Sequence, residues 1–120
     1  MTAERITGGV DVGTSAVKVA LFRVPDDGEP ELLSKYWERI RKRDPRSVAR
    51  HCYELALADA SLEEADVDYV ASTGEGEMVD FRVGHFYGMT THARGAAHLC
   101  PGVTGVLDVG ALHARAIHMN

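Results

Sequence analysis

Apolar and polar residues alternate along the first third of the chain. Val17, Val19 and Leu21 fall on one face of an extended segment, and Lys18 falls on the other. This period of two is typical of a half-buried strand. The segment before it is apolar on both faces, as a central strand is. The pattern therefore predicts three strands in two antiparallel hairpins, over residues 6–12, 16–24 and 31–39.

After this meander, the spacing of the apolar residues becomes that of a helix. Asp44 is suited to an N-cap and Pro45 to the first helical position, so we expect a helix from there to about residue 60. Its buried stripe is predicted to consist of Val48, Cys52, Leu55 and Ala56. A second helix, rich in small residues, is expected over residues 90–99. The remaining strands are predicted over residues 69–72, 105–109 and 114–119.

The order of these elements is β-β-β-α-β-α-β-β. A leading meander followed by strand–helix alternation is the layout of a ribonuclease-H-like α/β fold, in which helices flank a mixed sheet. The chain has 120 residues, which suits one domain, and it shows no repeat or linker. We therefore expect residues 1–120 to form a single lobe of this fold.

An acidic residue interrupts the first apolar strand just before a turn. Asp11 stands two residues ahead of Gly13, Thr14 and Ser15. Such a turn can direct backbone N–H groups and hydroxyls at a phosphate, and the carboxylate can hold a metal-bound water beside it. The alternative is a β-hairpin with a polar turn, because the four-residue pattern D-x-G-[ST] that Asp11 begins is common in proteins.

The same Asp-Val-Gly sequence closes a second apolar strand near the other end of the chain, at Asp108 and Gly110. The ends of strands in open sheets meet at one cleft, where ligands bind. We therefore predict that Asp11 and Asp108 are catalytic residues that flank one magnesium phosphate group, each through water. Gly13, Thr14, Ser15 and Gly110 are the predicted phosphate-binding residues.

Composition narrows the class of protein. The formal net charge is −5, which argues against a nucleic-acid partner. The chain contains no apolar run long enough to span a membrane and no secretory signal at its N-terminus, so no membrane partner is expected. Two cysteines, Cys52 and Cys100, are too few for a disulfide scaffold or a closed metal site. A cytoplasmic protein with reduced thiols is the simplest interpretation.

Other polar residues are given structural roles. His92 and His98 are six residues apart and point in different directions from a helix, which argues against a preformed metal site. Together with His85, they are expected to serve polar packing or partner contact. The segment Thr73–Glu77 is predicted to be a flexible rim loop, because its glutamates would repel phosphate. Lys18 is expected to lie too far along its strand to contact phosphate. A basic run is interpreted as a solvated face, or alternatively as a docking surface, and comprises Arg39, Arg41, Lys42, Arg43 and Arg46.

Several segments resemble a known family. GVDVGTSAVKVALF (9–22) resembles the first phosphate loop of the superfamily of acetate and sugar kinases, heat-shock chaperones and actin. More specifically, nearly the whole chain resembles the D-type subunits of ATP-dependent benzoyl-CoA reductases. These subunits belong with the BadF/BadG/BcrA/BcrD ATPases and the activators of 2-hydroxyacyl-CoA dehydratases. The segments that carry this resemblance are RIRKRDP (39–45), DVDYVASTGEGE (66–77), GHFYGMTTHARGA (84–96) and VLDVGALHARAI (106–117).

The resemblance implies a function. Subunits of this family bind and hydrolyse ATP with Mg²⁺, and two homologous ATPase subunits share a [4Fe-4S] cluster. Hydrolysis drives low-potential electrons, which reduced ferredoxin supplies to the complex, to the subunits that reduce the aromatic ring. By position, Asp11, Gly13, Thr14 and Ser15 match the first phosphate motif of the family. Asp108 and Gly110 match the second.

Two features depart from the family pattern. Residues 111–113 replace the glycine and Gln-Asp of the dehydratase activators, which fits the benzoyl-CoA reductase branch better. The chain is also expected to be the N-terminal part of such a protein, without the second lobe and the cluster-binding segment. Neither Cys52 nor Cys100 is predicted to bind the cluster, and the isolated chain is expected to bind ATP weakly and to be inactive. The alternatives are a fragment of a sugar or acetate kinase and a non-catalytic interaction lobe.

Overall fold

A computed structural model describes residues 4–110 and 114–119 of the chain. The chain forms two compact units, Met1–His85 and Phe86–Asn120. None of the helices within the described residues is long and apolar enough to cross a membrane.

The first unit is built on a five-stranded mixed sheet, with spatial order β3-β2-β1-β4-β5. Its strands are β1 (Glu4–Val12), β2 (Ala16–Pro25), β3 (Glu31–Arg39), β4 (Tyr69–Gly74) and β5 (Gly84–His85). The first three form the antiparallel meander. β4 is parallel to β1, and β5 is parallel to β4. β1 and β4 therefore end at the same edge of the sheet.

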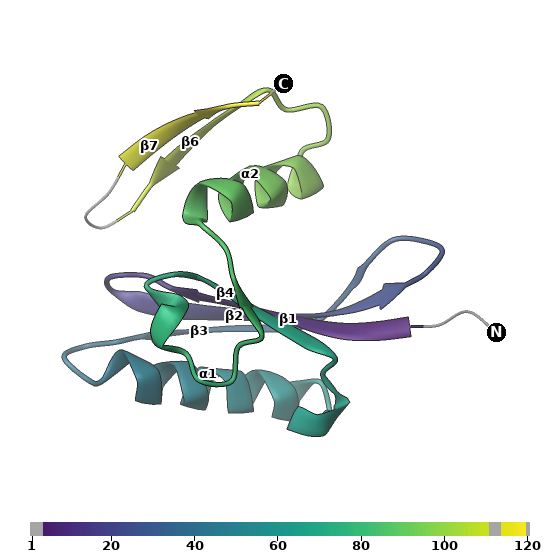
Figure 1. The fold of residues 1–120 in the computed structure, drawn as a ribbon, viewed down its shortest axis with the longest axis vertical. Helices are drawn as coiled ribbons and strands as arrows, with labels where there is room; N and C mark the ends of the chain where they lie inside the picture. The colour runs from purple at the N-terminus through teal and green to yellow at the C-terminus, as the bar shows by residue number, and fades with distance from the viewer. Residues whose placement is uncertain (1–3, 111–113, 120) are drawn as a thin grey trace. The chain divides into compact units, whose positions relative to one another are not determined.

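Helix α1 (Pro45–Asp59) connects β3 to β4 and covers one face of this sheet (Figure 1). It begins as the sequence predicts, because the Asp44 side chain accepts a hydrogen bond of 3.0 Å from the Arg46 N–H. The predicted stripe is wrong at Leu55, which is only half-buried. The helix instead buries Val48, Ala49, Cys52, Tyr53, Ala56 and Leu57.

The core of the first unit lies between α1 and the sheet. Val17, Val19 and Leu21 are almost completely buried there, as their alternation predicts. Ser34 is also buried on this face, and its hydroxyl donates a hydrogen bond of 2.8 Å to the carbonyl oxygen of Ala56. This bond satisfies a polar group that would otherwise destabilise the interior. The helix is thus fixed to β3 by a directional contact as well as by apolar packing.

The second unit is a helix followed by a hairpin. Helix α2 (Gly88–Leu99) contacts strand β6 (Gly105–Val109), which pairs in antiparallel register with β7 (Ala114–His118). This register places Asp108 directly opposite Arg115. Within the described part of the chain, the hairpin forms a two-stranded sheet separate from the larger one.

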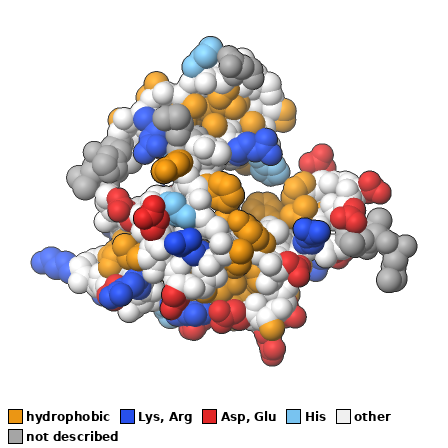
Figure 2. Space-filling view, viewed as in Figure 1, with side chains coloured by type: hydrophobic (Ala, Val, Ile, Leu, Met, Phe, Trp, Pro, Cys, Tyr) orange, Lys and Arg blue, Asp and Glu red, His pale blue; other side chains and the backbone are white. Residues whose placement is uncertain are grey.

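The surface carries mixed charge. Acidic and basic side chains are intermixed on the face shown in Figure 2. The basic run begins with Arg39 at the end of β3 and continues through a tight turn, in which Arg41 and Lys42 have φ values of 48° and 64°. Arg43 pairs with Glu38 at 2.8 Å and Arg46 pairs with Asp44 at 3.1 Å. These pairs agree with a solvated face, and the docking role stays a prediction.

Within the described residues, the observed element order contains every predicted strand and helix, with three additions. β5 has only two residues, and two short 3-10 helices occupy η1 (Glu64–Asp66) and η2 (Gly76–Met78). The prediction of one lobe over the whole chain stays a prediction.

Candidate phosphate-binding site

The turn after β1 is held by backbone hydrogen bonds. The Gly13 N–H donates to the carbonyl oxygen of Ala16 at 2.9 Å, and the Ile40 N–H donates to that of Ser15 at 2.9 Å. Thr14 and Ser15 are exposed. The turn therefore has a fixed backbone and presents two hydroxyl side chains at the surface, and its role in phosphate binding stays a prediction.

Asp11 lies against the end of the neighbouring parallel strand. It is half-buried in β1 and pairs in register with Thr73 of β4. The next residue of β4, Gly74, has a φ of +67°. A Cβ there would lie 2.4 Å from the carbonyl oxygen of Val12 and 2.9 Å from Oδ1 of Asp11. Only glycine fits this conformation and this space, so β4 passes directly beside the carboxylate.

Lys18 is closer to Asp11 than the sequence suggests. The antiparallel register of β1 and β2 places the two residues directly opposite each other, and so on the same face of the sheet. The alternation along β2 alone did not reveal this pair. The turn closes with Val12 opposite Val17, so counting one residue outward along each strand would have predicted the pairing of Asp11 with Lys18.

The segment Thr73–Glu77 is not the predicted rim loop. β4 continues to Gly74, and η2 begins at Gly76. The Glu75 N–H donates to the carbonyl oxygen of Val12 at 2.7 Å. Gly76 is buried, and a Cβ there would lie 2.8 Å from the Cβ of Ser72. The two glycines thus allow the segment to pack on the ends of β1 and β4.

His85 serves polar packing, one of the two roles predicted for it. Its Nδ1 lies 2.8 Å from the hydroxyl of Ser72, which is only 1% exposed. Its Nε2 lies 3.9 Å from Glu77. This serine is too deeply buried to act as a nucleophile, so the contact fixes β5 against β4 near the candidate site.

The predicted second phosphate motif lies in the second unit, where Asp108 belongs to β6. Its Oδ2 lies 2.6 Å from Nδ1 of His92 on α2 and 3.5 Å from Nε of Arg115 on β7. Gly110 follows β6 and is exposed. The departure from the activator pattern at residues 111–113 lies outside the described residues. Sequence reasoning missed both partners of Asp108, because they come from different elements.

The structure therefore brings Asp11, Gly13, Thr14 and Ser15 together in the first unit. Asp108 and Gly110 lie in the second unit. That the two aspartates flank one phosphate group stays a prediction.

The chemistry of both carboxylates fits a magnesium ion. Mg²⁺ prefers oxygen ligands and keeps several of its waters, so it is commonly bound through one or two carboxylates. The carboxylate of Asp11 lies beside the backbone of β4 at Gly74, where only glycine fits. Among the described residues, both contacts of the Asp108 carboxylate fall on Oδ2. No cluster of three or more His, Cys, Asp or Glu side chains suited to a metal occurs within residues 4–110 and 114–119.

The cysteines differ in their surroundings. Both are free, and Cys52 is completely buried whereas Cys100 is exposed. Burial, with a smaller contribution from the charge of Glu38, raises the pKa of the Cys52 thiol to about 11. A thiol with such a pKa is a poor metal ligand at neutral pH, because the thiolate is the binding form.

Comparison with known proteins decides the family. The model of the BadF/BadG/BcrA/BcrD ATPase family matches residues 9–120. The chain belongs to the BadF/BadG/BcrA/BcrD ATPase family. It is also 57% identical over 112 residues to the D-type subunit of the benzoyl-CoA reductase of Thauera aromatica, an alignment that covers 93% of this chain and 39% of that protein. Membership of an ATPase family implies nucleotide binding.

Solved structures confirm the predicted fold. The (R)-2-hydroxyglutaryl-CoA dehydratase component A of Acidaminococcus fermentans matches with a TM-score of 0.84 at 24% identity, over 97% of this chain and 43% of that one. The activator of the 2-hydroxyisocaproyl-CoA dehydratase of Clostridium difficile, with bound ADPNP, matches with a TM-score of 0.80 at 22% identity, over 96% and 41%. The chain thus spans less than half the length of these relatives.

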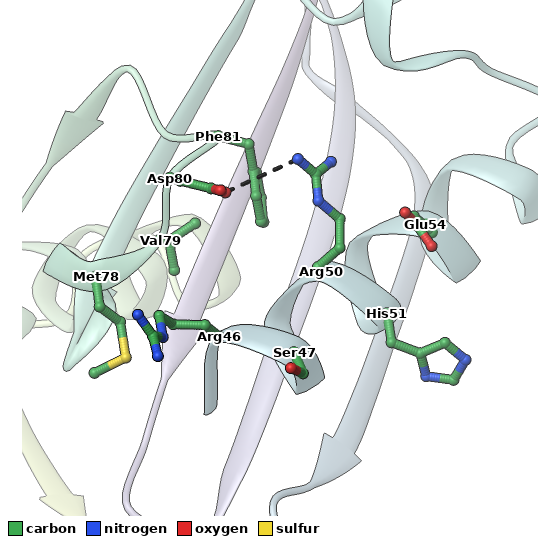
Figure 3. Close-up of a pocket in the computed structure, with 9 residues that line it drawn as sticks. All are labelled: Arg46, Ser47, Arg50, His51, Glu54, Met78, Val79, Asp80 and Phe81. Atoms are coloured by element: carbon green, nitrogen blue, oxygen red, sulfur yellow. Dashed lines mark ion pairs between the residues drawn. The ribbon is translucent and has the colours of Figure 1, made fainter. Parts of the chain in front are cut away.

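A separate hollow lies beside α1. Its volume is about 490 Å³, and it is lined by α1 and by residues 78–81 (Figure 3). The guanidinium of Arg50 lies 4.8 Å from the ring centre of Phe81 and pairs with Glu64 at 3.0 Å and with Asp80 at 3.9 Å. None of the predicted phosphate-binding residues lines this hollow, so it is distinct from the candidate site.

Proposed function

We propose that the chain contributes the phosphate-binding part of an ATP-binding and ATP-hydrolysing subunit of an ATP-dependent benzoyl-CoA reductase. Membership of the ATPase family and 57% identity to the D-type subunit of a benzoyl-CoA reductase support the class of protein. The observation that carries the proposal for the site is the close approach of β4 to Asp11, at a position where Gly74 leaves no room for a Cβ.

In this proposal each group has a separate role. Gly13, which has no Cβ, lets the phosphate approach the turn closely, and the hydroxyls of Thr14 and Ser15 bind phosphate oxygens. Asp11 and Asp108 act through water on a magnesium ion, which supplies positive charge to the phosphates when it is bound. Gly110 allows the backbone after β6 to approach the nucleotide closely.

The proposal includes the rest of the complex. Hydrolysis of ATP would be coupled to electron transfer from reduced ferredoxin through a [4Fe-4S] cluster shared with a homologous ATPase subunit, toward the subunits that reduce the aromatic ring. In this proposal neither Cys52 nor Cys100 is a ligand of the cluster, and the buried thiol of Cys52, with its raised pKa, agrees with that assignment. We place the complex in the cytoplasm, which the free thiols support.

The test is an assay of the chain in its native setting. The chain is tagged at its chromosomal locus and purified anaerobically with its associated subunits. Reduction of benzoyl-CoA by reduced ferredoxin is then measured with ATP, without nucleotide, and with a non-hydrolysable ATP analogue. The proposal predicts reduction only with ATP. Reduction that is equally fast without ATP, or a preparation that has no such activity with ATP, would contradict it.

A further inference from the structure

One carboxylate of the proposed site is oriented by two neighbours within its own unit. His92 of α2 and Arg115 of β7 both contact Oδ2 of Asp108, at 2.6 Å and 3.5 Å. All three side chains are partly buried, with exposed fractions between 25% and 38%. Contacts from two separate elements to one oxygen restrict rotation of the carboxylate. Without such contacts, the last side-chain torsion of an aspartate has a broad distribution.

The direction of the His92 contact follows from its chemistry. An ionised carboxylate can only accept hydrogen bonds, so Nδ1 of His92 must carry the hydrogen and donate it to Oδ2. The separation of 2.6 Å is short for a nitrogen–oxygen pair, as expected for a bond to a charged acceptor. Asp108 therefore selects one tautomer of His92, and the histidine in turn selects one orientation of the carboxylate.

Arg115 is held close to the carboxylate by the start of α2. A Cβ at Gly88 would lie 3.3 Å from Nη1 of Arg115 and 3.8 Å from both Cζ and Nη2. The flat guanidinium thus lies across Gly88, where an added Cβ would press on it. The register that sets Arg115 opposite Asp108 brings Nε to the same oxygen that His92 contacts.

We propose that His92 and Arg115 are positioning residues that hold Asp108 through Oδ2 and thereby leave Oδ1 to bind a water of the magnesium ion. The inference rests on the proposed function, in which Asp108 acts on Mg²⁺ through water. Partners of this kind orient metal-binding groups, and their loss typically lowers metal affinity by about 10-fold to 100-fold. The inference gives His92 a role beyond the polar packing or partner contact expected from the sequence.

The first test measures how nucleotide binding depends on magnesium. Binding of a fluorescent ATP analogue to the tagged protein from the native locus is titrated with Mg²⁺, in the wild type and in His92→Phe, His92→Asn and Asp108→Asn variants. His92→Phe should raise the Mg²⁺ concentration needed for half-maximal binding by about 10-fold or more, without changing the binding measured in EDTA. His92→Asn should restore most of the affinity, because its amide nitrogen occupies about the position of Nδ1. Arg94→Gln is the matched control, because Arg94 is exposed on the same helix.

The outcomes separate this inference from the proposed function. If the wild type shows no magnesium-dependent binding, or if Asp108→Asn leaves it unchanged, both fail. If Asp108→Asn weakens it while His92→Phe matches Arg94→Gln, the positioning inference alone fails. A second measurement needs no variant: nitrogen-15 magnetic resonance of the labelled chain should show the hydrogen of neutral His92 on Nδ1, and a hydrogen on Nε2 would overturn the inference.

Discussion

At the scale of single residues, backbone space decides where the candidate site can form. Gly74 combines a left-handed backbone with a Cβ position only 2.4 Å from the carbonyl oxygen of Val12. By contrast, a Cβ at Gly9 of β1 would meet no atom within 4 Å. The two glycines belong to neighbouring strands of one sheet, so they form a natural pair for separating a steric requirement from ordinary glycine flexibility.

We therefore expect Gly74→Ala to destabilise the protein by at least about 2 kcal/mol, because a non-glycine residue in this conformation is strained and its Cβ has no room. Gly9→Ala should change the free energy of unfolding by no more than about 1 kcal/mol in either direction. Urea unfolding followed by circular dichroism measures both. Equal effects of the two substitutions would mean that β4 does not pass Asp11 as described.

The two cysteines provide a second test at this scale. Cys52 is completely buried and its pKa is raised to about 11, whereas Cys100 is exposed. Because the thiolate is the reactive form, iodoacetamide at about pH 8 should modify Cys100 and leave Cys52 unmodified. Peptide mass spectrometry identifies the modified residue. In guanidinium chloride both should react, and similar rates for the two in the native protein would contradict the described core.

At the scale of elements, helix α1 is the part that stabilises the main sheet. Burial raises the pKa of Tyr53 on this helix to about 12, with a smaller contribution from Glu64, and raises that of Cys52 to about 11. The ring of Tyr53 also stacks on Phe81, with 4.4 Å between the ring centres. Both side chains are therefore held neutral under the sheet, and their ionisation opposes the packing of α1.

The sign of the resulting pH dependence is definite. The usual pKa values are 9.0 for Cys52 and 10.0 for Tyr53, below the folded values. The stability that these groups provide is complete below about pH 9 and is lost as pH rises toward about 12. Urea unfolding at a series of pH values should show this decline. Tyr53→Phe should make it shallower above about pH 10, and the exposed Tyr36→Phe should not; equal slopes in the two variants would contradict the assignment.

The sequence predicted most elements because their signals are local. Alternation located β1 to β3, and the Asp44-Pro45 pair located the start of α1. The error at Leu55 arose because a helical stripe can be placed in two rotations, and the fold selects the one that includes Tyr53 and Leu57. β5 has two residues, too few for any period to appear.

The candidate site was predictable only in part. Asp11 and its turn follow from a short motif. Gly74 and His92 do not, because their importance depends on which strands and helices lie beside each other. Lys18 is an intermediate case, because its position opposite Asp11 follows from the hairpin register once the turn is known.

At the scale of the whole molecule, the proposal assigns one carboxylate from each unit to the same magnesium nucleotide. Asp11 belongs to the first unit and Asp108 to the second. If both act on one ion, loss of either should reduce the same magnesium-dependent binding, and loss of both should reduce it by less than the product of the single effects. Two independent sites would instead give multiplicative effects.

The most direct test of this account is the affinity for Mg-ATP, measured by isothermal titration calorimetry on the protein purified from its native locus. Asp11→Asn and Asp108→Asn are compared with Asp26→Asn, a control in the exposed turn between β2 and β3. The account predicts that each of the first two substitutions lowers the affinity by about 10-fold or more, while the control remains like the wild type. Wild-type affinity in either Asp11→Asn or Asp108→Asn would contradict it.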